Sequence, residues 1–274
     1  MSIKQTTGLN RNIIDKYYTS ENAVNLCLQL VKENIVIDKE NDIILEPSAG
    51  NGSFIDIIKS LSDNYIFMDI EPENNSEIKK QDYLTFNFTE LPKHNRIHLI
   101  GNPPFGRQSS MAIKFIKKSC EYCDTISFIL PKSFKKDSLK SRFPSNFHLI
   151  KESELPPESF IVDGNPYDVP CIFQIWEKKQ YNREISEKLA PIGFKFVEKS
   201  ENPDISFRRV GVYAGKIDTN IADKSVQSHY FIKLDNKSKE TIESLKKIKY
   251  NFDNTVGPRS ISKQELIKEF IKVL

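Results

Sequence analysis

The chain has 274 residues, 38% hydrophobic and 28% charged, with 18 Phe, 10 Tyr and 1 Trp, which excludes a disordered chain and suffices for one large or two modest domains. No apolar run is long enough for a membrane span, and the polar N-terminus lacks a signal-peptide core, so we expect neither membrane insertion nor secretion. The four cysteines are scattered along the chain, so we expect a reducing compartment. The net charge is +3, but residues 181–274 hold 18 Lys/Arg against 13 Asp/Glu, which favours a polyanion partner or reflects only a lysine-rich surface.

From residue 20 to residue 178, helix-like and strand-like segments alternate. Helices are predicted over 21–31, 53–61 and 111–120, and strands over 42–45, 65–70, 96–100, 125–130, 147–150 and 169–176. Such alternation predicts βαβ units and a mostly parallel sheet covered on both faces. Ligands of such sheets bind beyond the carboxyl ends of the strands, where Glu46, Asp69 and Asn102 are expected to share one crevice.

After residue 180 the pattern changes. A strand is predicted over 229–234, and helices over 240–248 and 263–273. We therefore place a domain boundary near residue 180, followed by a small α+β region.

The segment Asn102-Pro103-Pro104-Phe105 carries the strongest chemical signal. Two prolines after a strand make the turn rigid and remove two backbone donors. The Asn102 side chain and the Pro103 carbonyl can then face one way as paired acceptors for an amine with two N–H bonds. The following aromatic ring can stack on the flat ring that bears this amine. The competing interpretation is an ordinary proline turn.

Three further segments carry chemistry. The turn Glu46–Phe54 (EPSAGNGSF) contains two glycines, which allow close approach of a ligand to the backbone, but it lacks the spacing of a phosphate loop. Asp69, at the end of the next predicted strand, is a candidate for the ribose hydroxyls of a nucleoside, with Glu71 as the competing choice. Asp82 and Tyr83 together can hydrogen-bond and stack a purine.

Taken in chain order, these segments resemble the S-adenosylmethionine-dependent amino-group DNA methyltransferases of the adenine-N6 branch, in the γ-class order. The resemblance covers residues 16–178 and includes Lys16–Ser20, which is similar to a motif that contacts the methionine part of the cofactor. It implies a Rossmann-like methyltransferase fold, with a mostly parallel seven-stranded sheet and helices on both faces. A catalytic domain is expected over residues 1–180 and a small basic target-recognition region over 181–274.

The resemblance also implies site residues. The cofactor S-adenosylmethionine would contact Tyr18, Thr19, Glu46, Pro47, Ala49, Gly50, Gly52, Phe54, Asp69, Ile70, Asp82, Tyr83 and Asn102. The catalytic set would be Asn102, Pro103, Pro104 and Phe105. Phe105 and Phe160 would hold the flipped adenine. Outside the resemblance, Arg208 and Arg209 could supply guanidinium contacts to phosphates or guanine edges, or could simply be exposed basic residues.

The expected function is therefore methylation of adenine N6 in duplex DNA, wherever the cell keeps its DNA. The alternatives are an RNA adenine methyltransferase, a protein-glutamine methyltransferase, and a catalytically silent nucleic-acid-binding subunit. The C-terminal region is small for a recognition domain, which suggests a short target, loose specificity or a second subunit such as a homodimer partner. Cys120 and Cys123 lack further ligands at zinc spacing, so no metal site is expected.

Overall fold

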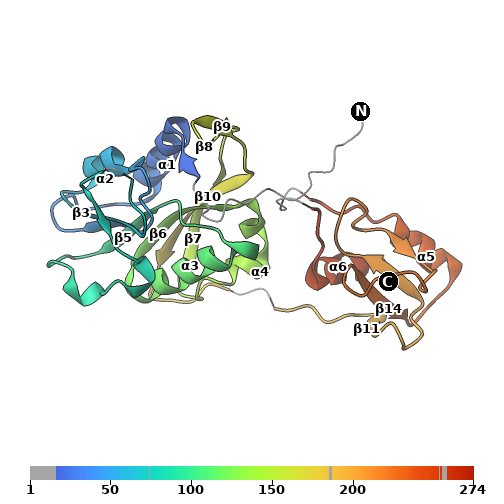
Figure 1. Ribbon diagram of the computed structural model, residues 1–274. Helices are drawn as coiled ribbons and strands as arrows, with labels where there is room; N and C mark the ends of the chain where they lie inside the picture. The colour runs from blue at the N-terminus through green and yellow to red at the C-terminus, as the bar shows by residue number, and fades with distance from the viewer. Residues whose placement is uncertain (1–16, 74, 185–186, 253, 255–257) are drawn as a thin grey trace. The chain divides into compact units, whose positions relative to one another are not determined.

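The computed structural model describes residues 17–73, 75–184, 187–252, 254 and 258–274 (Figure 1). Contacts divide the chain into two compact units, one running from residue 10 to residue 185 and the other containing residues 186–274. This division falls close to the predicted boundary at residue 180. The catalytic and target-recognition roles of the two parts remain predictions.

The larger unit is built on a seven-stranded sheet with the strand order β4-β3-β2-β5-β6-β10-β7. Its strands are β2 (Ile43–Glu46), β3 (Asn64–Asp69), β4 (Ile78–Lys80), β5 (Ile97–Gly101), β6 (Thr125–Pro131), β7 (Phe147–Glu154) and β10 (Cys171–Lys178). Strands β2 to β6 pair in parallel, whereas β10 runs antiparallel to both β6 and β7. The expected Rossmann-like fold is confirmed.

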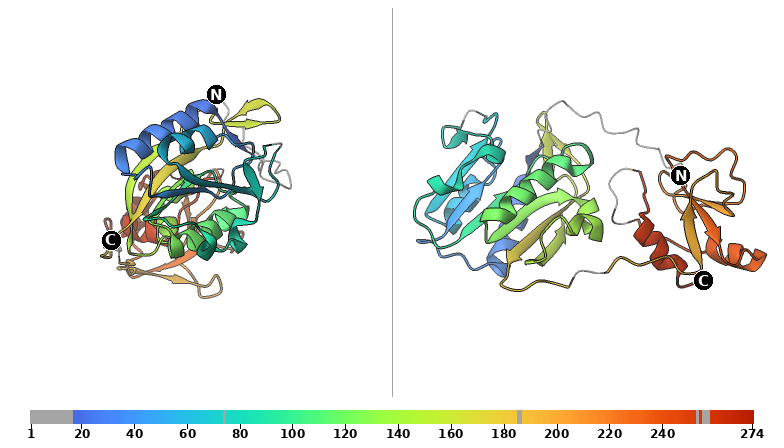
Figure 2. Two further views of the ribbon diagram at one scale, coloured as in Figure 1. Left: turned by 90° about the vertical axis from the view of Figure 1, so that its left-hand side faces the viewer. Right: turned by 90° about the horizontal axis from the view of Figure 1, so that it is seen from below.

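Helices cover both faces of this sheet (Figure 2, left). Helices α1 (Glu21–Asn34) and α2 (Ile55–Leu61) pack on one face, and α3 (Ser110–Tyr122) packs on the other. The central strands β2, β5 and β6 are mostly apolar because both of their faces are buried. In β2, for example, Ile44 joins the core below α1 and α2, whereas Leu45 joins the core below α3.

The strand order places the site. From β2 the chain builds β3 and β4 on one side, then returns to add β5 and β6 on the other. Adjacent strands β2 and β5 therefore diverge in their connections, and ligands bind at such a switch point beyond the carboxyl ends of the strands. The connections between the strands also contain short helical segments: η1 (Tyr83–Thr85), η2 (Phe88–Glu90), η3 (Arg107–Ser109), η4 (Lys132–Lys135) and α4 (Asp137–Lys140).

A second, smaller sheet ties the start of the described chain to a late hairpin. Strand β1 (Tyr18–Thr19) pairs antiparallel with β8 (Phe160–Val162), which pairs with β9 (Asn165–Tyr167). Strands this short carry no periodic signal, and the sequence did not predict them.

The smaller unit is a four-stranded antiparallel sheet with two helices, which confirms the expected α+β region. Its elements are β11 (Phe194–Val197), β12 (Ile205–Arg208), β13 (Ile217–Asp218), β14 (His229–Leu234), α5 (Lys239–Lys246) and α6 (Lys263–Phe270), in the sheet order β11-β14-β12-β13. Helix α6 begins with a capping box between Ser262 and Glu265. A single apolar cluster joins the helices to one face of the sheet.

Among the described residues, no helix has both the length and the apolar character needed to cross a membrane. Nor does any group of three or more His, Cys, Asp or Glu side chains in this part of the chain stand where it could hold a metal ion. The four cysteines are buried free thiols.

Candidate active site

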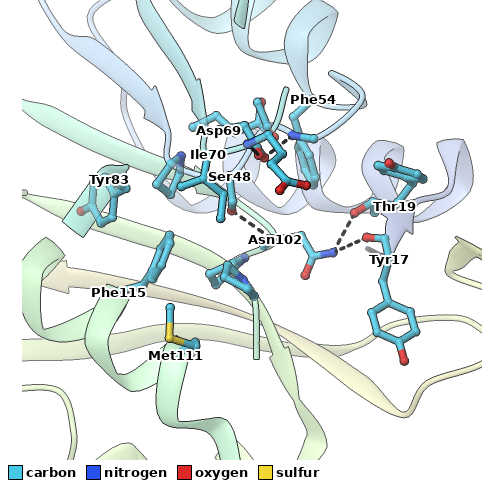
Figure 3. A pocket seen from close by; sticks show the side chains of 18 of the residues that line it. Tyr17, Thr19, Ser48, Phe54, Asp69, Ile70, Tyr83, Asn102, Met111 and Phe115 are labelled. Atoms are coloured by element: carbon cyan, nitrogen blue, oxygen red, sulfur yellow. Dashed lines mark hydrogen bonds between the residues drawn. The ribbon is translucent and has the colours of Figure 1, made fainter. Parts of the chain in front are cut away.

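A pocket opens at the carboxyl ends of β2, β3 and β5, where the topology predicts one (Figure 3). The residues that line it and were predicted as site residues are Tyr18, Thr19, Glu46, Pro47, Ala49, Gly50, Phe54, Asp69, Ile70, Asp82, Tyr83, Asn102, Pro103, Pro104 and Phe105. The structure therefore brings five segments of the sequence together around one cavity. The role of each residue in binding or catalysis remains a prediction.

The turn between β2 and α2 forms one wall of the pocket. Gly50 has φ +55°, and a Cβ atom there would lie 3.3 Å from the ring of Tyr18. Glycine is favoured because the turn needs a left-handed conformation and close approach of an aromatic ring. Gly52, also with positive φ, does not line the pocket, and its missing Cβ makes room for Ile55 instead.

Asp69, at the end of β3, holds this turn in place. One carboxylate oxygen accepts from the backbone N–H of Gly50 and the other from that of Glu71, both at 2.8 Å. Two lone pairs of the Asp69 carboxylate, which was expected to accept from ribose hydroxyls, are therefore used by backbone N–H groups, although each carboxylate oxygen keeps one further lone pair. Glu71, the competing acid, also lines the pocket and is exposed.

Glu46, the last residue of β2, is a buried acid with spare capacity. Its side chain is 1% exposed, and among the described residues its Oε2 atom has no hydrogen-bond partner. Burial, together with the negative charge of Asp69, raises the pKa of Glu46 to about 8. An orphaned carboxylate oxygen aimed at a cavity suits a cationic ligand group, such as the ammonium of an amino-acid moiety.

An apolar surface lies at another side of the pocket. The rings of Tyr83 and Phe115 have their centroids 5.0 Å apart, and the Tyr83 hydroxyl is bonded to Ser119 at 2.8 Å. The preceding Asp82 accepts from the Leu84 backbone N–H at 2.8 Å and caps η1. An exposed carboxylate beside a buried ring is an arrangement that can hold an aromatic heterocycle.

Asn102 follows β5, and its side chain is fixed by neighbours. The amide nitrogen donates to the Tyr17 carbonyl at 3.1 Å and to the Thr19 hydroxyl at 3.3 Å (Figure 3). The Ser48 hydroxyl donates to the Asn102 carbonyl at 3.0 Å and anchors the backbone. Because both amide hydrogens are engaged, the side-chain oxygen remains as an acceptor beside the pocket.

The residues after Asn102 shape the same wall. Pro103 is buried, Pro104 and Phe105 are half-buried, and the Phe105 carbonyl accepts from the backbone N–H groups of Met111 and Ala112. These two bonds attach the tetrapeptide to the start of α3. The prolines contribute no N–H groups, so the wall offers acceptors and apolar surface rather than donors.

Three predicted substrate residues lie elsewhere. Phe160 is 0% exposed and does not line the pocket. Its ring packs edge-on against the Tyr17 ring, with the ring centroids 6.2 Å apart. Its expected stacking on a flipped base is therefore corrected to packing beneath Tyr17, because β8 turns the ring inward. Arg208 and Arg209 belong to the smaller unit. Lys16 lies outside the described residues.

Further pocket residues were not among the predicted site residues, although some of them, such as Tyr17 and Ser48, lie inside predicted segments. Tyr17, Ser48, Met111 and Phe115 all line the cavity. Met111 and Phe115 occupy successive turns of α3, but apolar residues at that spacing are equally typical of a helix that faces a core. Ser48 lies inside the glycine turn, and only the fold shows that its hydroxyl reaches the backbone of the next strand.

Comparison with known proteins agrees with this picture. Residues 39–167 match the family model of the EDM2 methyltransferase-like domain. Over 176 residues the chain is 26% identical to the protein ENHANCED DOWNY MILDEW 2 of Arabidopsis thaliana, a match that covers 54% of this chain and 13% of that protein. The chain thus spans only a small part of this curated relative.

Solved structures give similar matches at low identity. A protein of Pyrococcus horikoshii described as an RNA methyltransferase has a TM-score of 0.47 and 18% identity, covering 64% of this chain and 93% of its own. A Listeria monocytogenes protein described as a class I S-adenosylmethionine-dependent methyltransferase has a TM-score of 0.45 and 15% identity, covering 63% and 64%. A methyltransferase domain is supported, and so is the expected cofactor, S-adenosylmethionine.

Proposed function

We propose that this protein transfers a methyl group from S-adenosylmethionine to the exocyclic N6 amine of adenine in DNA. The observation that carries the proposal is the fixed side-chain amide of Asn102, whose oxygen is left as an acceptor beside the pocket. The adjoining Pro103 carbonyl is the second acceptor. A planar amine with two N–H bonds is the chemical group that two neighbouring acceptors fit.

Asn102 and Pro103 act by positioning the substrate amine. When bound, S-adenosylmethionine supplies a methyl group attached to a sulfonium sulfur. Asn102 and Pro103 accept both amine hydrogens, which keeps the nitrogen lone pair out of the ring and directs it at the methyl carbon. One C–N bond forms as one C–S bond breaks, and the amine then loses a proton that has become acidic. No strongly basic side chain is needed, and orientation supplies much of the rate.

Access to N6 requires a base outside the duplex, since this amine is engaged in base pairing. Phe105 is the aromatic residue of the pocket wall that follows the two acceptors directly, and it is half-buried. Its ring would support the extruded base. With Phe160 buried in the core, no second stacking residue is proposed.

The acidic side of the pocket suits the cofactor. Glu46 has an unsatisfied carboxylate oxygen for an ammonium group, while Asp69 or Glu71 can accept from ribose hydroxyls. The apolar surface formed by Tyr83 and Phe115, beside Asp82, suits a purine ring. Retention of all these features weighs against a catalytically silent subunit.

Transfer of a labelled methyl group to duplex DNA, RNA and protein tests the proposal directly. We expect incorporation into DNA as N6-methyladenine, abolished by Asn102→Ala with little change in S-adenosylhomocysteine affinity. Asn87→Ala is the matched control, since Asn87 caps η2 and does not line the pocket. Label in RNA alone, or in protein alone, would replace the DNA assignment, and no label in any substrate would refute the enzyme.

A further inference from the structure

The smaller unit carries a row of basic side chains across three neighbouring backbone segments. Arg208 on β12 is paired with His229 on β14. On the other side of β12, the backbone N–H of Arg208 donates to the backbone carbonyl of Lys216 at 2.8 Å, and Lys216 directly precedes β13. Neighbouring strands lie about 4.8 Å apart, so Lys216, Arg208 and His229 form a continuous cross-strand row.

Successive side chains of a strand point to opposite faces of the sheet, and the side chains of this row point away from the core. Ile205, Phe207 and Ile217 are buried in the apolar cluster below the sheet. Side chains next to them point to the opposite face. Arg208, Lys216 and His229 all line one pocket on that face.

The charges of this pocket are unevenly compensated. Lys224 pairs with Asp218 at 3.0 Å and with Asp223 at 3.2 Å, and the charge of Lys216 also acts on Asp218, so the two carboxylates of the pocket face the three cations Arg208, Lys216 and Lys224. Neither Arg208 nor Lys216 forms an ion pair with any residue that the structure describes. Two cations directly opposite each other destabilise a sheet unless an anion lies between or above them.

The geometry keeps Arg208 ready for a ligand. Its Nε atom donates to the Val210 carbonyl at 2.8 Å and one terminal nitrogen donates to the Ser228 hydroxyl at 3.1 Å, which fix the guanidinium. Lys216 is exposed at the rim. Burial, helped by the charges of Arg208 and Lys224, lowers the pKa of His229, whereas the Ser225 carbonyl and the charge of Asp223 act in the opposite direction.

The neighbouring arginine does not take part. Arg209 donates to the Gln227 carbonyl at 2.7 Å, and its guanidinium lies 5.7 Å from the centre of the Tyr230 ring. It does not line the pocket. The expected pair Arg208 and Arg209 is thereby replaced by Arg208 with Lys216.

We propose that this pocket binds a backbone phosphate of the nucleic acid that the protein methylates. The inference rests on the proposed function for the identity of the partner. Arg208 and Lys216 bracket the phosphate oxygens, as charged donors do at nucleic-acid interfaces. Tyr213, 71% exposed and lining the same pocket, offers a ring for the adjoining sugar or base.

The salt dependence of binding is the first test. The full chain is titrated with a fluorescent DNA duplex, and separately with a single-stranded RNA, at several salt concentrations. Lys216→Gln should weaken DNA binding and reduce the slope of log K against log salt by about 0.9, the value for one lost phosphate contact. Lys237→Gln is the matched control, because Lys237 is also exposed but lies beyond the far end of β14, outside the pocket.

A change of slope in Lys216→Gln alone supports the pocket, provided that its thermal unfolding matches the wild type. Equal slopes for the two variants, or wild-type protein that binds neither oligonucleotide, would overturn it. The imidazole NMR signal of His229, assigned with His229→Gln, gives a second measurement. The oligonucleotide should shift it, whereas a shift with inorganic phosphate but not with the oligonucleotide would identify a free-anion site and refute the inference.

The two proposals fail separately. Methyl transfer to DNA with unchanged slopes in Lys216→Gln would leave the function and remove the pocket. A reduced slope without methyl transfer to any nucleic acid would leave the pocket and remove the function.

Discussion

The side-chain nitrogen of Asn102 lies 3.3 Å from the hydroxyl of Thr19, and both residues line the pocket. Thr19 is 6% exposed and comes from β1, while Asn102 follows β5. The Tyr17 carbonyl can only accept, so a flipped amide would turn its oxygen toward this carbonyl, whereas the Thr19 hydroxyl can accept or donate. Thr19 thus appears in the structure as a support of Asn102, whereas the sequence suggested a cofactor contact.

Thr19→Val should separate these two roles. Loss of one acceptor leaves an amide hydrogen unpaired and permits the wrong orientation, so we expect roughly a tenfold lower kcat, equivalent to about 1.4 kcal/mol. S-adenosylhomocysteine affinity, measured by calorimetry, should be unchanged, and Thr19→Ser should restore turnover. A large loss of cofactor affinity with normal kcat would assign Thr19 to the cofactor instead.

Binding of S-adenosylhomocysteine should release protons near pH 7. The raised pKa of Glu46, about 8, means that the free protein holds this carboxyl mostly protonated, whereas an ammonium partner favours the carboxylate. Calorimetry in buffers of different ionisation enthalpy counts the protons. Glu46→Gln should abolish the release, and a wild type whose proton count does not depend on Glu46 would contradict the pairing.

The same group predicts a pH dependence of stability. The folded pKa of about 8 exceeds the ordinary value of 4.5, so the folded state holds the extra proton between these values. The contribution of this protonated carboxyl to the free energy of unfolding is present in full below pH 4.5 and is lost as the pH rises through about 8. Urea unfolding of the free protein should show a smaller decline over this range in Glu46→Gln, and parallel curves would refute the assignment.

His98 should act in the opposite pH direction. It is fully buried between Asp42, at 3.0 Å, and Thr125, at 2.7 Å, and burial lowers its pKa despite the aspartate. The unfolded chain therefore takes up a proton first as the pH falls below about 6.5, which favours unfolding. The wild type should lose more stability than His98→Gln between pH 7 and pH 5, as measured by urea unfolding.

Gly50→Ala should destabilise the glycine turn by two additive causes. A left-handed alanine costs about 1–2 kcal/mol, and the new methyl group meets the Tyr18 ring at 3.3 Å. Gly164→Ala is a matched control, since Gly164 has φ +76° but no atom within 4 Å of the added carbon. The excess loss of stability in Gly50→Ala, measured by thermal unfolding, reports the Tyr18 contact. Equal losses would show that the ring moves away freely.

Sequence patterns captured the parts of the fold that carry strong periodicity. The predicted strand 229–234 coincides with β14, and the strand predicted over 125–130 is β6 with one residue more. Strand β4 was missed because its three residues, Ile78–Lys80, include two exposed lysines at the edge of the sheet. Strands β1, β8 and β9 exist only through pairing with one another, which no local pattern reports.

The candidate site divides in the same way. Motif residues such as Glu46 and Asn102 follow directly from the ends of predicted strands, and the pocket contains both. Which way a side chain points was not predictable, and this is why Phe160 was expected in the site and Thr19 was not expected to hold Asn102. Arg209 was expected to act together with Arg208, but it does not line the same pocket, because adjacent residues of a chain need not share a face.

The pairing of β1 with β8 sets when the site can be completed during synthesis. Thr19 leaves the ribosome early, yet its strand partner Phe160 is made only after β5, β6 and β7. Until that hairpin exists, the acceptors that orient Asn102 have no sheet to hold them. A nascent chain can thus build its glycine turn and the Asn102–Phe105 segment before the amide of Asn102 is fixed, and this amide is fixed only once β8 has been made.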